Sequence, residues 1–129
     1  MHETIVVCKE GTINSYLDCL IVATNRKKAG EDIAVVFMDG GLAALVDKKY
    51  GYPSELEGHA DAIKKNAEKM GVPSDPYELI KMASSAGVPL YANYAWVKLL
   101  GAEVPEGLEK MELKDFLGEL AKAKQVITF

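Results

Sequence analysis

Short apolar segments rich in β-branched residues alternate along the chain with longer segments of helical periodicity. The clearest apolar segments lie at 4–8, 33–38 and 88–92. Nearly continuous apolar runs of this length are typical of strands that are buried on both faces of a parallel sheet. We also expect a short strand at 108–111 and a last strand at 125–129.

Between these segments, apolar residues recur at the spacing of a helix face. We expect helices over 15–29, through 42–46, over 59–70, from 76 to 86, over 94–100 and through 113–121, with a loop over 50–58. The strongest helix start has Asp75 as N-cap, Pro76 at the first position and Glu78 at capping-box spacing. Asn14 is the expected N-cap of the first helix, and Gly30 is its expected stop.

The alternation of strands and helices predicts an α/β fold. We expect three α/β/α layers around a mostly parallel sheet of about five strands, joined by right-handed crossovers. No repeat or linker composition divides residues 1–129, so a single domain is expected. Ligands of such folds bind beyond the carboxyl ends of the strands, which selects the loops that begin at Cys8, Asp39 and Ala92.

Composition narrows the classes of function. Apolar residues make up 49% of the chain and charged residues 26%, with a net charge of −4. Because binding to phosphates requires a surplus of Lys and Arg, this balance argues against a nucleic-acid binder. No apolar stretch approaches the roughly 20 residues that span a bilayer, and no secretory signal is evident. We therefore expect a cytoplasmic protein with no membrane partner and with reduced cysteines.

Four stretches resemble the DsrE/DsrF-like family of sulfur-relay proteins, whose fold is also called YchN-like. They are 5–30, the strand and turn VVFMDGG at 35–41, the segment 87–101 that begins GVPLYA and ends LLG, and the C-terminal helix that closes with VITF at 126–129. The resemblance covers most of the chain, whereas roughly residues 48–75 look like extra length. It implies a three-layer α/β/α fold and assembly into trimers or hexamers.

The resemblance also implies a place for sulfur chemistry. Active members of the family carry persulfide sulfur on a cysteine at the start of the short helix after the third strand. A helix N-terminus suits this role because it lowers the pKa of a thiol. The matching position here is Asn93, which cannot hold a persulfide. The chain thus resembles a variant that lacks the usual persulfide cysteine, and Asn93 is also a good helix N-cap.

Cys8 is the candidate for any remaining thiol chemistry. It ends the first strand on the side where ligands are expected, but free cysteine is also commonly buried as a packing residue. Cys19 lies in the middle of a helix and is expected to pack. The expected ligand-binding residues are Asp39, Gly40, Asn93 and Tyr94, all in the loops at the strand ends. Asp39 has a second interpretation as the cap of the helix that follows it.

Other candidate groups are few. Tyr91, Tyr94 and Trp96 lie close together in the sequence, where they would line an apolar pocket or a subunit interface. His59 opens an amphipathic helix and is a candidate general base, although a solvated position explains it as well. No spacing of His and Cys matches a metal site, so we predict neither a metal nor a cofactor.

Three hypotheses of function follow. The first is a non-catalytic or cryptic DsrE/DsrF-like member of a sulfur-relay or redox system, which binds a small ligand or a partner protein as a homo-oligomer. The second is a thiol-dependent sulfurtransferase or a peroxiredoxin-like enzyme that uses Cys8, assisted by His59. The third is a purely structural subunit that pairs with a cysteine-bearing paralogue.

Overall fold

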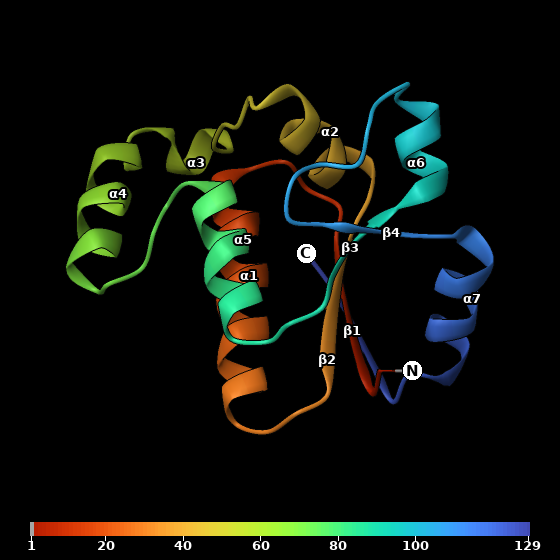
Figure 1. Cartoon of the computed structure of the whole chain (residues 1–129). Coiled ribbons are helices and arrows are strands. Elements are labelled where there is room, and N and C mark those ends of the chain that lie inside the picture. Colours follow the sequence, from red (N-terminus) through yellow and green to blue (C-terminus); the bar gives the residue numbers. More distant parts are fainter. Residues whose placement is uncertain (1) are drawn as a thin grey trace.

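The structure is a computed structural model that describes residues 2–129, and its centre is a five-stranded parallel sheet (Figure 1). The strand order is β4-β3-β2-β1-β5, and every neighbouring pair is parallel. The strands are β1 (Thr4–Cys8), β2 (Ile33–Phe37), β3 (Leu90–Asn93), β4 (Glu109–Met111) and β5 (Gln125–Thr128). The helices are α1 (Ile13–Lys28), α2 (Asp39–Asp47), α3 (Ser54–Glu57), α4 (Ala60–Lys69), α5 (Pro76–Ser85), α6 (Tyr94–Leu99) and α7 (Leu113–Lys122).

The order of the strands sets the side on which each helix lies. The chain steps in one direction from β1 to β4, so right-handed crossovers place the intervening helices on one face of the sheet. The last crossover returns past three strands to β5, which places α7 on the other face. Figure 1 shows α1 and α5 on one side of the sheet and α7 on the other. The predicted α/β/α fold with a parallel five-stranded sheet is therefore confirmed.

Each face of the sheet has its own apolar cluster, because alternate strand residues point to opposite faces. On the α1 side, Val6, Val35 and Phe37 pack among helix residues that include Tyr16 and Leu79. On the α7 side, the buried cluster consists of Ile5, Val7, Ala34, Val36, Met111 and Phe116. Burial on both faces is the reason why the strand sequences are continuously apolar.

The expected cap of the first helix is wrong. Helix α1 begins two residues earlier than predicted, with Thr12 in the N-cap position. The amide of Ile13 donates to the carbonyl of Gly51 at 3.0 Å, so a distant segment satisfies the first turn. Asn14 lies inside that turn, and its Oδ1 is buried without a hydrogen-bond partner among residues 2–129. Gly30 does stop α1, with a φ of +92°.

The start of α5 is as predicted. The carboxylate of Asp75 accepts a hydrogen bond from the amide of Glu78 at 3.1 Å, and Pro76 occupies the first turn. Helix α2 begins at Asp39, three residues before the expected 42, because the turn 39–41 is itself helical. The remaining limits agree with the sequence to within about two residues, the usual uncertainty of helix ends. One difference is the short helix α3, which lies inside the segment 50–58 that was expected to be a loop.

Candidate functional site

The loops that begin at Cys8, Asp39 and Ala92 share one edge of the sheet, but the side chains of the first and third loops lie apart. Cys8, Phe37 and Ala92 are aligned across β1, β2 and β3, so the three loops open at one edge as expected. Strand β2 lies between the other two. Two inter-strand spacings separate β1 from β3 by about 10 Å. Asn93 follows Ala92, and neighbouring strand residues point to opposite faces. The sheet thus keeps the Cys8 thiol and the Asn93 side chain apart.

Cys8 has no solvent-exposed surface. Its carbonyl accepts from the amide of Met38 at 3.1 Å, and its thiol lies 3.7 Å from the carbonyl of Glu10. Gly41 covers it: a Cβ on that glycine would overlap the Cys8 carbonyl and would lie 3.3 Å from the sulfur. A reagent cannot reach this thiol without displacing the first turn of α2.

Cys19 is a second buried thiol, beside Cys8. Both are free and fully buried in the cluster on the α1 side. Burial raises the pKa of the Cys19 thiol, and the neighbouring Cys8 raises it further. A raised pKa keeps this thiol protonated and poorly nucleophilic. The packing interpretation of Cys19 therefore agrees with its surroundings.

Asp39 and Gly40 follow β2 and lie against Lys9, which follows β1, so they connect the two strand ends by contacts and do not line an opening. Asp39 is inside the first turn of α2 with a φ of +50°, and its carboxylate lies 3.4 Å from the ammonium of Lys9. The N-cap position is Met38, so Asp39 does not cap the helix as expected. The amide of Gly41 donates to the Lys9 carbonyl at 2.9 Å. This amide, which a bound anion would need, is already satisfied by the chain.

Asn93 caps α6. Its Oδ1 accepts from the amide of Trp96 at 3.4 Å, and only 1% of the residue is exposed. The ammonium groups of Lys98 and Lys110 lie 5.1 and 4.8 Å from the centre of the neighbouring Tyr94 ring. The expectation of an N-cap at Asn93 is met. A ligand at Asn93 or Tyr94 stays a prediction.

A cavity of about 420 Å³ lies between the end of α2, the start of α5 and the loop before β4. We call it the Tyr50–Tyr77 cavity, and it is lined by Lys48, Tyr50, Asp75, Tyr77, Ile80, Lys81, Glu106 and Gly107. Its volume lies within the range of small-molecule sites. Sequence reasoning missed it, because its two tyrosines are far apart in the chain and neither belongs to a recognisable motif.

The two tyrosines of the cavity differ in their hydrogen bonds. The Tyr77 hydroxyl donates to the carbonyl of Leu45 at 2.7 Å. The Tyr50 hydroxyl is buried and has no partner among residues 2–129. Burial, with Tyr77 and Asp75 nearby, raises the pKa of Tyr50 to about 12, so its hydroxyl keeps its proton and can donate. The Tyr50 ring meets Tyr16 edge-on, with the centroids 5.7 Å apart.

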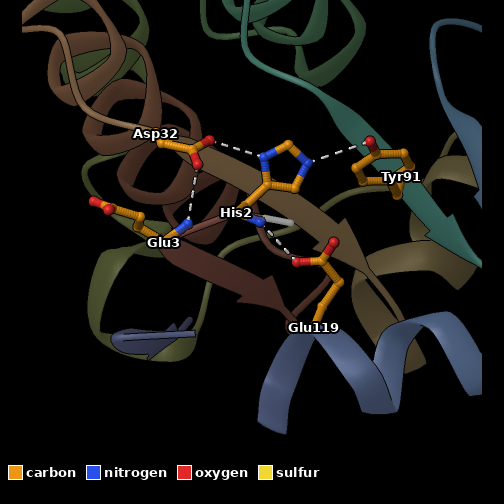
Figure 2. A network of polar contacts seen from close by, with 5 residues as sticks. All are labelled: His2, Glu3, Asp32, Tyr91 and Glu119. Carbon is orange, nitrogen blue, oxygen red and sulfur yellow. Dashed lines mark hydrogen bonds and ion pairs between the residues drawn. The ribbon is translucent and has the colours of Figure 1, made fainter. Parts of the chain in front are cut away.

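A separate polar network lies at the amino edge of the sheet (Figure 2). The His2 ring nitrogen Nδ1 lies 2.9 Å from Asp32 Oδ1, and Nε2 lies 3.5 Å from the Tyr91 hydroxyl. The His2 amide donates to Glu119 of α7 at 3.0 Å, and the Glu3 amide donates to Asp32 at 3.3 Å. If Nδ1 donates to Asp32, Nε2 is left as the acceptor for Tyr91.

The pKa values of two side chains in this network differ from their usual values. The hydrogen bond from His2 holds the pKa of Asp32 below its usual range. Burial raises the pKa of Tyr91, and Glu109 and Glu119 raise it further. The network ties the start of β1 to the residue before β2, to β3 and to α7. Nothing in the sequence marked His2, because its partners are distant along the chain.

The remaining candidates lie apart from these groups. His59 is exposed in the N-cap position of α4, whereas Cys8 lies beneath α2. No group of three or more His, Cys, Asp or Glu side chains within residues 2–129 is placed to hold a metal ion. None of the helices in the described part of the chain combines the length and the apolar character needed to cross a bilayer.

Comparison with known proteins informs the fold alone. No model of a protein family matches the chain, and no curated protein matches it. Among solved structures, the YchN protein from E. coli is similar with a TM-score of 0.67 and 14% sequence identity, over 100% of both chains. At that identity the similarity carries no activity from one protein to the other. The chain has a YchN-like fold.

Proposed function

We propose that this protein is a ligand-binding member of the DsrE/DsrF-like group that performs no thiol chemistry. It would act as a non-catalytic component of a sulfur-relay or redox system. One observation carries the proposal: Cys8 is fully buried beneath Gly41. Asn93 adds support: the resemblance aligns it with the reactive cysteine of the DsrE/DsrF-like family, and its side chain is used as a helix cap.

The Tyr50–Tyr77 cavity supports the binding role. Its volume is about 420 Å³, and the partly exposed side chains of Tyr50 and Tyr77 form part of its wall. Aromatic walls around a cavity of this size favour an apolar or aromatic ligand. The closed loops at Cys8 and Asp39 offer no comparable opening.

The thiol part of the proposal is tested by labelling the native protein with iodoacetamide at pH 8 and locating the label by peptide mass spectrometry. We expect Cys8 and Cys19 to react only after denaturation, because both are buried. A Lys65→Cys variant, with its new thiol on an exposed position of α4, should label rapidly and serves as control. Rapid labelling of native Cys8 would instead support a sulfurtransferase or peroxiredoxin-like enzyme.

The binding part is tested by nuclear magnetic resonance with benzyl alcohol as a neutral aromatic probe. We expect the methyl signals of Ile80, which lines the cavity, to shift during the titration. Signals of Ile21, which lies in the groove between α1 and α4, should move little and provide the control. Equal shifts at both positions, or none at Ile80, would contradict binding in the cavity.

The chain is also proposed to act as a homo-oligomer, a trimer or hexamer. Leu113 and Leu117 of α7 and Val126 of β5 are exposed. Strand β5 is at the edge of the sheet, so its outer hydrogen-bonding groups are free of other strands within residues 2–129. Edge strands of this kind pair with other chains, and a second copy supplies a matching edge. Pairing with a cysteine-bearing paralogue is the alternative assembly.

A further inference from the structure

The charges around the Tyr50–Tyr77 cavity are balanced. Two ammonium groups, of Lys48 and Lys81, and two carboxylates, of Asp75 and Glu106, belong to its lining. A site for a phosphate or another multiply charged anion requires a surplus of positive charge, which this lining lacks. The balance favours a ligand that is neutral overall.

Two of the four charged groups are already engaged by the protein. The Asp75 carboxylate accepts from the Glu78 amide as the cap of α5, and the Lys81 ammonium lies 3.2 Å from the Glu78 carboxylate. Lys48 and Glu106 have no ion-pair partner within the described residues 2–129. The cavity therefore offers one free cation and one free anion, from segments far apart in the chain.

The free cation is held at the wall of the cavity. The ammonium of Lys48 lies 5.5 Å from the centre of the Tyr77 ring, a distance at which a cation is attracted to the ring face. Lys48 and Tyr50 leave the same end of α2, so the cation and one aromatic wall of the cavity are neighbours along the chain. A ligand carboxylate in the cavity would be attracted to the Lys48 ammonium.

The rest of the lining suits an apolar body. Tyr50 and Tyr77, which are partly exposed, present the apolar surface of their rings to the cavity. Aromatic walls favour aromatic and other apolar groups through offset and edge-on contacts. The opposite charge, on Glu106, is available to a ligand ammonium.

On these grounds we propose that the Tyr50–Tyr77 cavity binds an α-amino acid zwitterion with an apolar or aromatic side chain. This inference rests on the proposed ligand-binding function and names the ligand class of that site. The ligand carboxylate would be held by Lys48, its ammonium by Glu106, and its side chain between the two tyrosines.

Isothermal titration calorimetry on the full chain tests the ligand class with three compounds that share a phenyl ring. L-phenylalanine carries both charges, 3-phenylpropanoate carries only the carboxylate, and 2-phenylethylamine carries only the ammonium. We expect L-phenylalanine to bind at least about tenfold more tightly than either of the others, since each missing charge removes one charge-assisted contact.

Variants assign each charge to its partner. Lys48→Met should abolish the preference for L-phenylalanine over 2-phenylethylamine, and Glu106→Gln should abolish its preference over 3-phenylpropanoate. Lys65→Met removes a cation from the exposed surface of α4 and should leave both preferences unchanged.

The outcomes separate this inference from the proposed function. If either singly charged compound binds as tightly as L-phenylalanine, the zwitterion class is wrong while a ligand-binding cavity stands. The same holds if none of the three binds but benzyl alcohol still shifts the Ile80 signals. If none of the four compounds binds, both the inference and the proposed binding function fail.

Discussion

At the scale of single residues, Gly41 controls how closely α2 approaches β1. Its backbone passes over Cys8, and its carbonyl accepts a hydrogen bond from the buried Tyr16 hydroxyl. Burial strongly raises the pKa of Tyr16, so this donor keeps its proton throughout the range of pH in which proteins fold. Cys8, Tyr16 and Gly41 thus form one packed unit, and a side chain at position 41 has no room.

We predict that Gly41→Ala destabilises the protein. The added Cβ would overlap the Cys8 carbonyl, so backbone must move. Overpacking of this kind costs about 1–3 kcal/mol, measured as the free energy of unfolding in urea. Gly118→Ala is the matched control, because Gly118 is also helical and a Cβ there meets no atom within 4 Å. Gly118→Ala should be neutral or stabilising by up to about 1 kcal/mol. Equal stability of the two variants would contradict the close approach of α2 to β1.

At the scale of secondary-structure elements, the network around His2 connects three strands and a helix through their polar groups. His2 and Asp32 precede β1 and β2, whereas Tyr91 lies in β3 and Glu119 in α7 (Figure 2). The His2 side chain is 18% exposed, so its contacts are partly shielded from water. The amino edge of the sheet is therefore held by side chains as well as by the backbone ladder.

We predict that this network makes folding stability depend on pH in the acid range. The pKa of Asp32 is lowered in the folded state, so the folded protein binds fewer protons there than the unfolded chain. The stabilisation is complete above the unfolded pKa of about 3.9 and is lost as the pH falls through the lower folded value. In Asp32→Asn, the free energy of unfolding should therefore fall less steeply below about pH 4 than in the wild type.

The control for this prediction is Glu68→Gln, which removes a carboxylate from an exposed position of α4. Its unfolding free energy should follow the wild-type pH dependence. Glu31, whose pKa is lowered by Arg26, is unchanged in Asp32→Asn. It therefore still contributes to the pH dependence of the unfolding free energy in that variant. An unchanged slope in Asp32→Asn would show that the carboxylate of Asp32 is not stabilised by His2.

The elements also show what the sequence can and cannot predict. The cap at Asp75 was predictable because its partner, Glu78, is three residues away. The cap at Asn14 was wrong because the amide of Ile13 is satisfied by Gly51, a contact that only the tertiary fold creates. The cavity was missed for the same reason. Tyr50 and Tyr77 are separated along the chain by α3 and α4, and only the tertiary fold brings them to one cavity.

At the scale of the whole molecule, the two faces of the sheet are covered unequally. Helices α1 and α5 pack on one face, whereas α7 alone covers the opposite face in the described part of the chain (Figure 1). Leu113, Phe116 and Leu117 share one apolar face of α7 by their helical spacing. Only Phe116 is buried, and Leu113 and Leu117 are 48% and 56% exposed. The apolar face of α7 is wider than the sheet can cover, which is typical of a surface that another chain covers.

We predict that the double variant Leu113→Glu, Leu117→Glu reduces the size of the assembly, measured by size-exclusion chromatography with light scattering. Two carboxylates buried between copies would lack partners and would oppose association, whereas on a monomer they would be hydrated. Met70→Glu is the control, because Met70 is 77% exposed on α4, away from α7. The wild type and the control should share one larger mass, and the double variant should have a smaller one. A monomeric wild type would exclude the homo-oligomer, and an unchanged mass in the double variant would place its interface elsewhere than on α7.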